Sequence, residues 1–91
     1  MKYKPPKSMI DNFETVFKTV SDLYGVSVQD MRGKKRHHHI VEPRFVAIHL
    51  AKMTGRKVSW PLVGWYANRD HSSCVYADER VRAWKDTDKK F

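Results

Sequence analysis

The sequence predicts an all-α fold, a five-to-six-helix bundle that contains a helix-turn-helix. Apolar residues recur at three- and four-residue spacing, residue types typical of helix ends separate these segments, and no segment alternates as a strand would. A chain of 91 residues, 41% of them hydrophobic, builds one domain with one modest core. We therefore expect a basic flexible arm over residues 1–7, the helix-turn-helix domain over residues 8–86, and a frayed tail over residues 87–91.

The first helix is expected to run from Ser8 to the residue before Gly25. Ser8 or Asp11 can cap its start, and a glycine such as Gly25 commonly ends a helix. The helical spacing predicts that its buried side consists of Ile10, Phe13, Val16, Phe17, Val20, Leu23 and Tyr24.

A short helix through Met31 and a longer helix beginning near Pro43 are expected next. Ser27 is suited to cap the short helix, with Asp30 placed as in a capping box, and Gly33 ends it. Residues 33–39 contain no apolar residue, which indicates an exposed loop. Proline is tolerated in the first turn of a helix because its missing N–H costs nothing there. The third helix, ended by Thr54-Gly55, is expected to bury Val46, Ile48, Leu50 and Met53.

Two helices joined by a tight turn follow. Ser59 is a suitable N-cap for a helix over residues 60–66, and Asn68 tolerates the left-handed conformation that short turns need. The last helix starts near Asp70 and places its inward side chains at Cys74, Ala77, Val81 and Trp84. A short helix, a turn and a longer helix form a helix-turn-helix, whose second helix enters the DNA major groove by its N-terminal end.

Positive charge is concentrated in the middle of the chain. Between Arg32 and Lys57 the sequence has eight basic residues and one acidic residue, a net charge of +7 out of the chain's +8. Such a segment attracts a polyanion and releases counterions on binding. Composition alone does not separate DNA from RNA, an acidic membrane surface, or a merely basic soluble surface.

Polar residues cover the turn and the first turn of the last helix, Asn68–Ser73. An arginine can contact a guanine with two hydrogen bonds, an aspartate can accept from a cytosine amino group, and a histidine can bond a base edge. The two serines can meet a thymine methyl group or a phosphate. These properties allow base readout by Arg69, Asp70, His71, Ser72 and Ser73. A well-capped, solvated helix start is the alternative interpretation.

The run Arg-Asp-His-Ser-Ser over residues 69–73 resembles the motif that opens the recognition helix in the C-terminal DNA-binding domain of the bacterial replication initiator DnaA. Further segments resemble that family in the same order: Val20–Met31, Lys34-Lys35-Arg36, Pro43-Arg44, Ala47–Ala51 and Ser59–Gly64. The resemblance covers residues 10–86 and implies a fold like the DnaA C-terminal domain and the Trp repressor.

The resemblance also implies how the DNA contacts are divided. Arg36 matches the minor-groove arginine, with Lys34 and Lys35 beside it in the basic loop. Residues 69–73 match the positions that read the major groove. Further phosphate contacts are expected from Arg44, Ser59, Trp60 and Arg80.

The sequence departs from the family pattern at several places. Ala67-Asn68 replaces the usual Gly-Gly, Leu62 replaces an acid, and His37–His39 replaces a loop usually richer in Ser and Arg. These changes bear on the target sequence more than on the fold. The ATPase loop Gly-x-x-x-x-Gly-Lys-Ser/Thr does not occur, so we expect no enzyme activity, no ATP hydrolysis and no cofactor.

The histidines and the single cysteine allow other interpretations. Adjacent histidines in a loop point in different directions, so no metal site is expected at His37–His39. Their partial protonation would instead add positive charge beside Arg36. Cys74 is expected to be a core residue, although a nucleophilic pair with His71 is conceivable at helical spacing. His49 is expected to be packed or partly exposed.

The favoured function is sequence-specific binding of double-stranded DNA at a DnaA-box-like site, for regulation of transcription or replication. The alternatives are a small RNA-binding or ribosome-associated protein and an adaptor that binds DnaA or another replication or transcription protein. We expect a monomer or weak dimer, a phage or bacterial regulator that stands alone. Because the sequence lacks a membrane span and a secretory signal, a cytoplasmic, nucleoid-associated location is expected, with no membrane partner.

Overall fold

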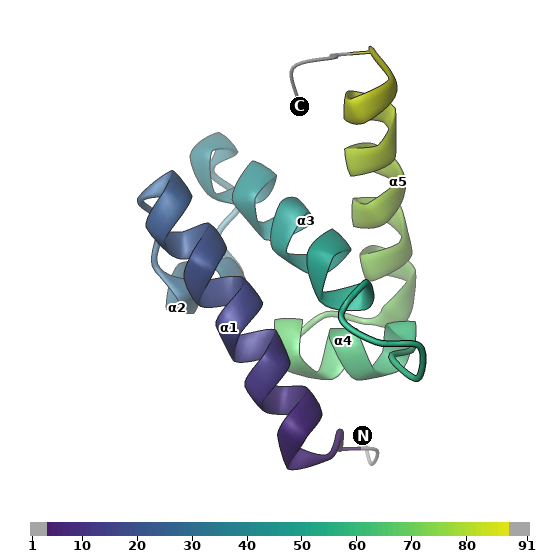
Figure 1. Cartoon of the computed structure of the whole chain (residues 1–91). Helices are drawn as coiled ribbons and strands as arrows, with labels where there is room; N and C mark the ends of the chain where they lie inside the picture. Colours follow the sequence, from purple (N-terminus) through teal and green to yellow (C-terminus); the bar gives the residue numbers. More distant parts are fainter. Residues whose placement is uncertain (1–3, 88–91) are drawn as a thin grey trace.

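The computed structural model describes residues 4–87, which form five α-helices and no strand (Figure 1). The predicted all-α fold is thereby confirmed. Part of the expected flexible arm packs on the domain, since Pro5 is buried; residues 1–3 and 88–91 lie outside the described part. Within the described part, no helix combines the length and the apolar character that crossing a membrane requires. The helices are α1 (Lys7–Tyr24), α2 (Val28–Arg32), α3 (His38–Lys52), α4 (Trp60–Ala67) and α5 (His71–Thr87).

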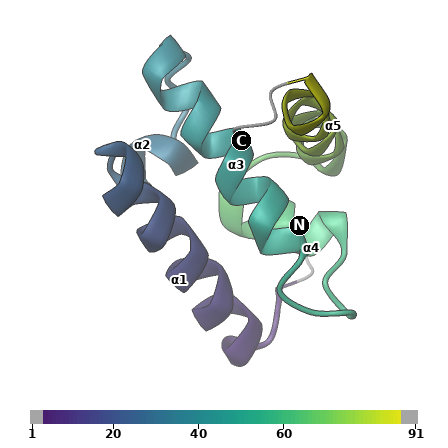
Figure 2. The same ribbon diagram turned by 45° about the horizontal axis from the view of Figure 1, so that its top comes forward.

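Helix α3 is the centre of the bundle and contacts all four other helices. It lies between α1 and α5, as Figure 2 shows. Aromatic rings join α1 to α4, because Phe13 and Phe17 pack on Tyr66 with ring centroids 6.0 and 4.9 Å apart. The five helices thus share one core, whose fully buried members include Phe13, Phe17, Val20, Met31, Ile40, Ile48, Val63, Cys74 and Val81.

Residues predicted from the sequence to end or cap helices do so in the structure. Gly25 ends α1 in the left-handed conformation, with φ of 70°. The hydroxyl oxygen of Ser27 accepts a hydrogen bond of 3.0 Å from the backbone N–H of Asp30, which caps α2 as predicted. The side chain of Asp70 caps α5 in the same manner by accepting from the N–H of Ser73 at 2.9 Å.

The predicted start of α3 is wrong. The helix begins at His38 and places Pro43 in its second turn. Ile40 explains the earlier start, because it is 2% exposed and opens a helical stripe that is buried against the other helices. That stripe consists of Ile40, Arg44, Ala47, Ile48 and Ala51.

Four side chains predicted to be buried are exposed instead, among them Tyr24, the last residue of α1, which is 37% exposed. Leu50 and Met53, 39% and 66% exposed, lie outside the buried stripe of α3, and Met53 is already the C-cap of that helix. Leu23 is 77% exposed because it lies beyond Val20, the last buried residue of α1. Helical spacing therefore indicated the buried face correctly only where another helix covers it.

A buried polar network ties α3 to α5. His49, 4% exposed, contacts Asp78 of α5 with 2.6 Å between Nδ1 and Oδ1. The ammonium of Lys85 lies 3.0 Å from Nε2 of the same ring. Since an ammonium only donates, these partners assign a ring that donates from Nδ1 and accepts at Nε2. The guanidinium of Arg82 bonds the second oxygen of Asp78 at 2.9 Å. The network holds α5 against the centre of the bundle.

Candidate nucleic-acid interface

The turn between α4 and α5 depends on the close approach of two backbone segments. Asn68 takes the left-handed conformation, with φ of 64°, so it supplies the geometry that a glycine commonly supplies in such a turn. The backbone N–H of Arg69 then donates to the carbonyl of Gly64 at 2.9 Å. A Cβ on Gly64 would lie 2.4 Å from the Arg69 carbonyl oxygen. The Ala67-Asn68 departure therefore leaves a tight turn in place.

The polar segment 69–73 opens α5 and presents most of its side chains to solvent. His71, Ser72 and Ser73 are exposed on the first turn of the helix. Hydrogen bonds from the side chain and the backbone of Ser73 lower the pKa of Asp70. Asp70 is therefore a carboxylate at neutral pH, the form that accepts hydrogen bonds from base amino groups.

Arg69 connects this segment to the end of α2. Its guanidinium donates to the carbonyls of Ala67 and Asn68, at 3.4 and 3.0 Å, and also to the carbonyl of Gly33. Burial, and then the nearby charge of Arg36, lower the pKa of Arg69. The guanidinium thus bonds the protein backbone, and the contact to guanine expected from the sequence would require it to leave these carbonyls.

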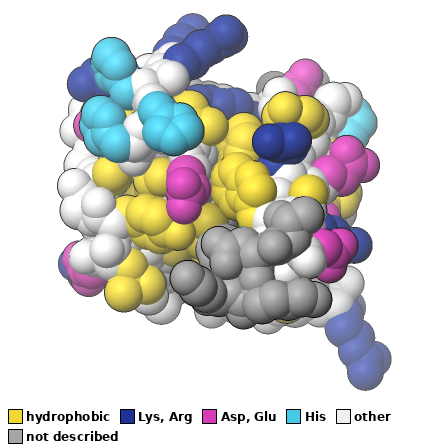
Figure 3. Space-filling model, turned by 90° about the horizontal axis from the view of Figure 1, so that it is seen from above, with side chains coloured by type: hydrophobic (Ala, Val, Ile, Leu, Met, Phe, Trp, Pro, Cys, Tyr) yellow, Lys and Arg dark blue, Asp and Glu magenta, His cyan; other side chains and the backbone are white. Residues whose placement is uncertain are grey.

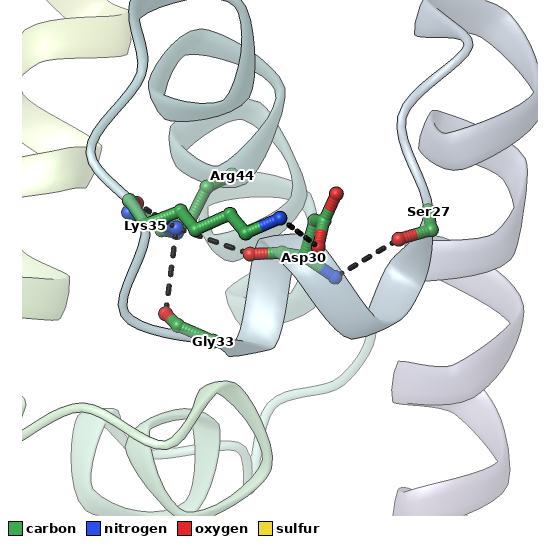
Figure 4. Close-up of polar contacts among 5 residues, drawn as sticks. All are labelled: Ser27, Asp30, Gly33, Lys35 and Arg44. Atoms are coloured by element: carbon green, nitrogen blue, oxygen red, sulfur yellow. Dashed lines mark hydrogen bonds and ion pairs between the residues drawn. The ribbon is translucent and has the colours of Figure 1, made fainter.

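The predicted phosphate contact at Arg44 is not supported, because its side chain is turned inward (Figure 4). Arg44 is 4% exposed. Its Nε donates to the carbonyl of Met31 at 2.7 Å, and its Nη2 donates to those of Asp30, Gly33 and Lys35, at 3.1, 3.4 and 2.6 Å. Arg44 therefore fixes the backbone that leads from α2 into the basic loop, defined here as residues 34–36.

The basic loop itself is exposed and lies beside the polar segment 69–73. Lys34, Lys35 and Arg36 are all exposed, and Lys35 pairs with Asp30 at 3.5 Å (Figure 4). The loop and the start of α5 line one hollow of about 450 Å³. The structure thus brings together two segments that are more than 30 residues apart in the sequence. The residues that line the hollow are Lys34, Arg36, Arg44, Asn68, Arg69, Asp70 and Ser73.

The other residues predicted to contact phosphates do not line this hollow. Arg80 is exposed farther along α5, and Ser59 and Trp60 are half-buried at the start of α4. Ser59 is the N-cap by position, although its side chain makes no capping hydrogen bond. The ammonium of Lys52 lies 5.4 Å from the centre of the Trp60 ring. These three side chains therefore lie outside the hollow.

The histidine run lies beside the basic loop. His37 is the N-cap of α3, while His38 and His39 belong to its first turn, and all three side chains are exposed. The rings of His37 and His39 stack with centroids 5.8 Å apart. On the face seen in Figure 3, histidine side chains gather at one edge next to Lys and Arg side chains. Among the described residues, no three His, Cys, Asp or Glu side chains are grouped to hold a metal ion.

Cys74 is a core residue, as predicted. Its side chain is 0% exposed, and burial, followed by the charge of Asp70, raises the pKa of its thiol to about 12. We predict that iodoacetamide leaves Cys74 unmodified at pH 8 in the folded protein and alkylates it in urea, as mass spectrometry would detect. A raised folded-state pKa also means that stability falls as the pH rises from about 9 towards 12. Rapid alkylation without urea would contradict this burial.

Sequence comparisons agree with the fold and with the extent of the resemblance. A family model described as the bacterial dnaA protein helix-turn-helix matches residues 13–81. The chain is similar to the chromosomal replication initiator protein DnaA of Paraburkholderia phymatum and of Burkholderia multivorans. Each is 39% identical over 69 residues, which cover 75% of this chain and 13% of the relative. The chain thus spans a small part of the length of the curated relatives it matches.

Proposed function

Because the chain belongs to the family of the bacterial DnaA helix-turn-helix domain, we propose that it binds double-stranded DNA at a specific, DnaA-box-like site. One observation carries the proposal: the basic loop and the polar segment 69–73 line a single hollow. A helix-turn-helix places the N-terminal end of its second helix in the major groove. The adjacent loop then reaches the neighbouring minor groove, where an inserted arginine such as Arg36 is attracted by the negative potential of A·T-rich DNA.

The proposed roles follow from exposure and chemistry. His71, Ser72 and Ser73 are free of the core and project from the first turn of α5, so they read base edges together with Asp70. Lys34 and Lys35 contact phosphates from the basic loop, and Arg80 and the start of α4 add outer phosphate contacts. Arg44 is omitted from the contact set because its guanidinium is buried.

The biological setting belongs to the same proposal. The named relatives are replication initiators, which supports a role in DNA replication or in transcription at related sites, in the bacterial cytoplasm. We propose that these 91 residues bind DNA without hydrolysing ATP, since the sequence contains no phosphate-cradling Gly-x-x-x-x-Gly-Lys-Ser/Thr loop. Incubation with labelled ATP, with and without duplex DNA, tests that statement directly.

Two substitutions test the DNA-binding proposal. Arg36→Ala removes the minor-groove arginine and His71→Ala removes a base contact, so each should weaken binding to a DnaA-box duplex by about 1–3 kcal/mol. Fluorescence anisotropy titration at fixed salt measures the change. Lys18→Ala is the matched control for Arg36→Ala, because it removes one exposed positive charge from α1, outside the residues of the hollow.

Measuring each variant on duplexes of different sequence separates base-reading residues from phosphate-contacting residues. His71→Ala should relax base preference, whereas Lys34→Ala should weaken every duplex alike and reduce the salt dependence of binding by about one ion. Unchanged affinity in both Arg36→Ala and His71→Ala would disprove the proposal. Preference for structured RNA over the duplex in direct competition would favour the RNA-binding alternative.

A further inference from the structure

A second hollow, of about 510 Å³, lies between α3 and α5 beside the basic loop. Its floor is apolar and is formed by Val41, Phe45 and Ile48. Its remaining lining is polar or aromatic and consists of Arg36, Arg44, Arg69, Ser72, Ser73 and Tyr76. The hollow thus shares Arg36, Arg44, Arg69 and Ser73 with the site described above and extends it towards the second turn of α5.

Tyr76 is the feature of this hollow that neither sequence motif nor family resemblance indicated. Its side chain is 55% exposed. It follows Ser72 by four residues, so it lies on the same face of α5, about 6 Å farther along the helix axis. The ring of Phe45 meets the Tyr76 ring edge-on at 5.9 Å and stacks on Trp84 at 6.2 Å. The exposed ring of Tyr76 on the proposed reading helix therefore packs against Phe45, which in turn stacks on Trp84.

The arrangement has a consequence for any duplex bound as proposed. One sugar–phosphate strand separates a minor groove from the adjacent major groove. A protein with Arg36 in the first groove and Ser72 and Ser73 in the second must straddle that strand. The hollow lies between these residues, since all three line it.

We propose that this hollow seats the strand between the two grooves and that Tyr76 is one of its binding residues. The inference rests on the proposed function and adds a site to it. The phenol hydroxyl of Tyr76 donates to a phosphate oxygen, and its ring packs on the neighbouring deoxyribose. Ser72 lies one turn earlier and donates to the preceding phosphate or the base beside it.

The chemistry of the lining fits such a strand better than it fits a small apolar ligand. A nucleic-acid backbone alternates an anionic phosphate with a largely apolar sugar. The hollow combines an apolar floor with positive charge from Arg36 and Arg69. On the face seen in Figure 3, hydrophobic side chains likewise reach the surface next to Lys and Arg side chains.

The test uses the full chain and two tyrosines. Tyr76→Phe removes only the hydroxyl and should weaken binding to a DnaA-box duplex about three- to tenfold, and Tyr76→Ala should weaken it further. Tyr24→Phe is the matched control because Tyr24, 37% exposed at the end of α1, lines neither hollow. The specific and scrambled duplexes should lose affinity by the same factor, since backbone contacts carry no sequence information. Circular dichroism checks that each variant is folded.

Neutral methylphosphonates, placed one at a time along the strand, identify the contacted phosphate. A methylphosphonate at that position should reduce the affinity of the wild-type protein for the duplex. The same change should reduce the affinity of Tyr76→Phe only slightly, because this variant has already lost the hydrogen bond to that phosphate. If the wild type binds no duplex, the proposed function itself fails. If the wild type binds and Tyr76→Phe and Tyr76→Ala match Tyr24→Phe, the function stands and this inference is overturned. A change in base preference in Tyr76→Phe would also overturn it, because the hydroxyl would then read a base.

Discussion

Replacing Gly64 with alanine is expected to destabilise the domain by about 2–3 kcal/mol, the cost typical of overpacking at a tight site. The new Cβ would lie 2.4 Å from the carbonyl oxygen of Arg69, which is backbone and cannot rotate away. Helix propensity alone predicts the opposite sign, because alanine is favoured over glycine by about 1 kcal/mol within a helix. The clash exceeds that gain. Thermal unfolding followed by circular dichroism should show a melting temperature lower by roughly 10–20 °C.

The same substitution should also weaken DNA binding. A methyl group on Gly64 pushes away the backbone of Arg69, which leads directly into Asp70 and the first turn of α5. Gly55→Ala is the matched control, because its Cβ would meet only a side-chain carbon of Val58 at an ordinary 3.7 Å. That control should change stability by less than about 0.5 kcal/mol. If Gly64→Ala proved as stable as Gly55→Ala, the close approach of Gly64 to the backbone of Arg69 would be disproved.

Helices whose ends carry local signals were predictable from the sequence. Ser27 and Asp70 cap helices through hydrogen bonds to a residue three positions on, and Asn68 takes the left-handed conformation that its residue type tolerates. Such interactions depend on a few neighbouring residues, so sequence reasoning finds them. The juxtaposition of the basic loop and the polar segment was anticipated from the family resemblance. Its contacts, such as the bond from Arg69 to Gly33, required the structure.

Helix α3 was harder to predict because it is covered on several sides. Its neighbours also bury residues outside the stripe that begins at Ile40, so the buried side of the helix is broad, and its start lies in a polar run of histidines. The spacing of Ile40, Ala47, Ile48 and Ala51 was nevertheless a usable signal. Arg44 lies at the same helical spacing, so the pattern predicts that its side chain points into the core and that its charge is buried. A charged residue at a core position calls for several hydrogen-bonding partners rather than a phosphate.

Replacing Arg44 with lysine should cost about 2–4 kcal/mol of stability although the charge is kept. The planar guanidinium reaches four backbone carbonyls from two nitrogens, and a single ammonium cannot reproduce that geometry. The carbonyls of Met31 and Lys35 accept the two shortest hydrogen bonds from Arg44, and the substitution would remove them. Each buried polar group left without a partner costs about 1–3 kcal/mol. Urea unfolding measures the loss. Arg56→Lys, at an exposed position between α3 and α4, should leave stability unchanged.

DNA binding by Arg44→Lys separates an organising role from a direct phosphate contact. Without the four bonds the basic loop loses its anchor to α3, so Arg36 is no longer held at the hollow and affinity should fall for every duplex. Lowering the temperature, which refolds a larger fraction of the variant, should restore part of that affinity. If Arg44 instead contacted a phosphate directly, Arg44→Gln would reduce the salt dependence of DNA binding by about one ion, as Lys34→Ala is expected to do. If Arg44→Gln reduced the salt dependence in this way while the protein stayed folded, the inward position of Arg44 would not persist on DNA. An unchanged salt dependence would support our interpretation that its charge is spent on holding the loop.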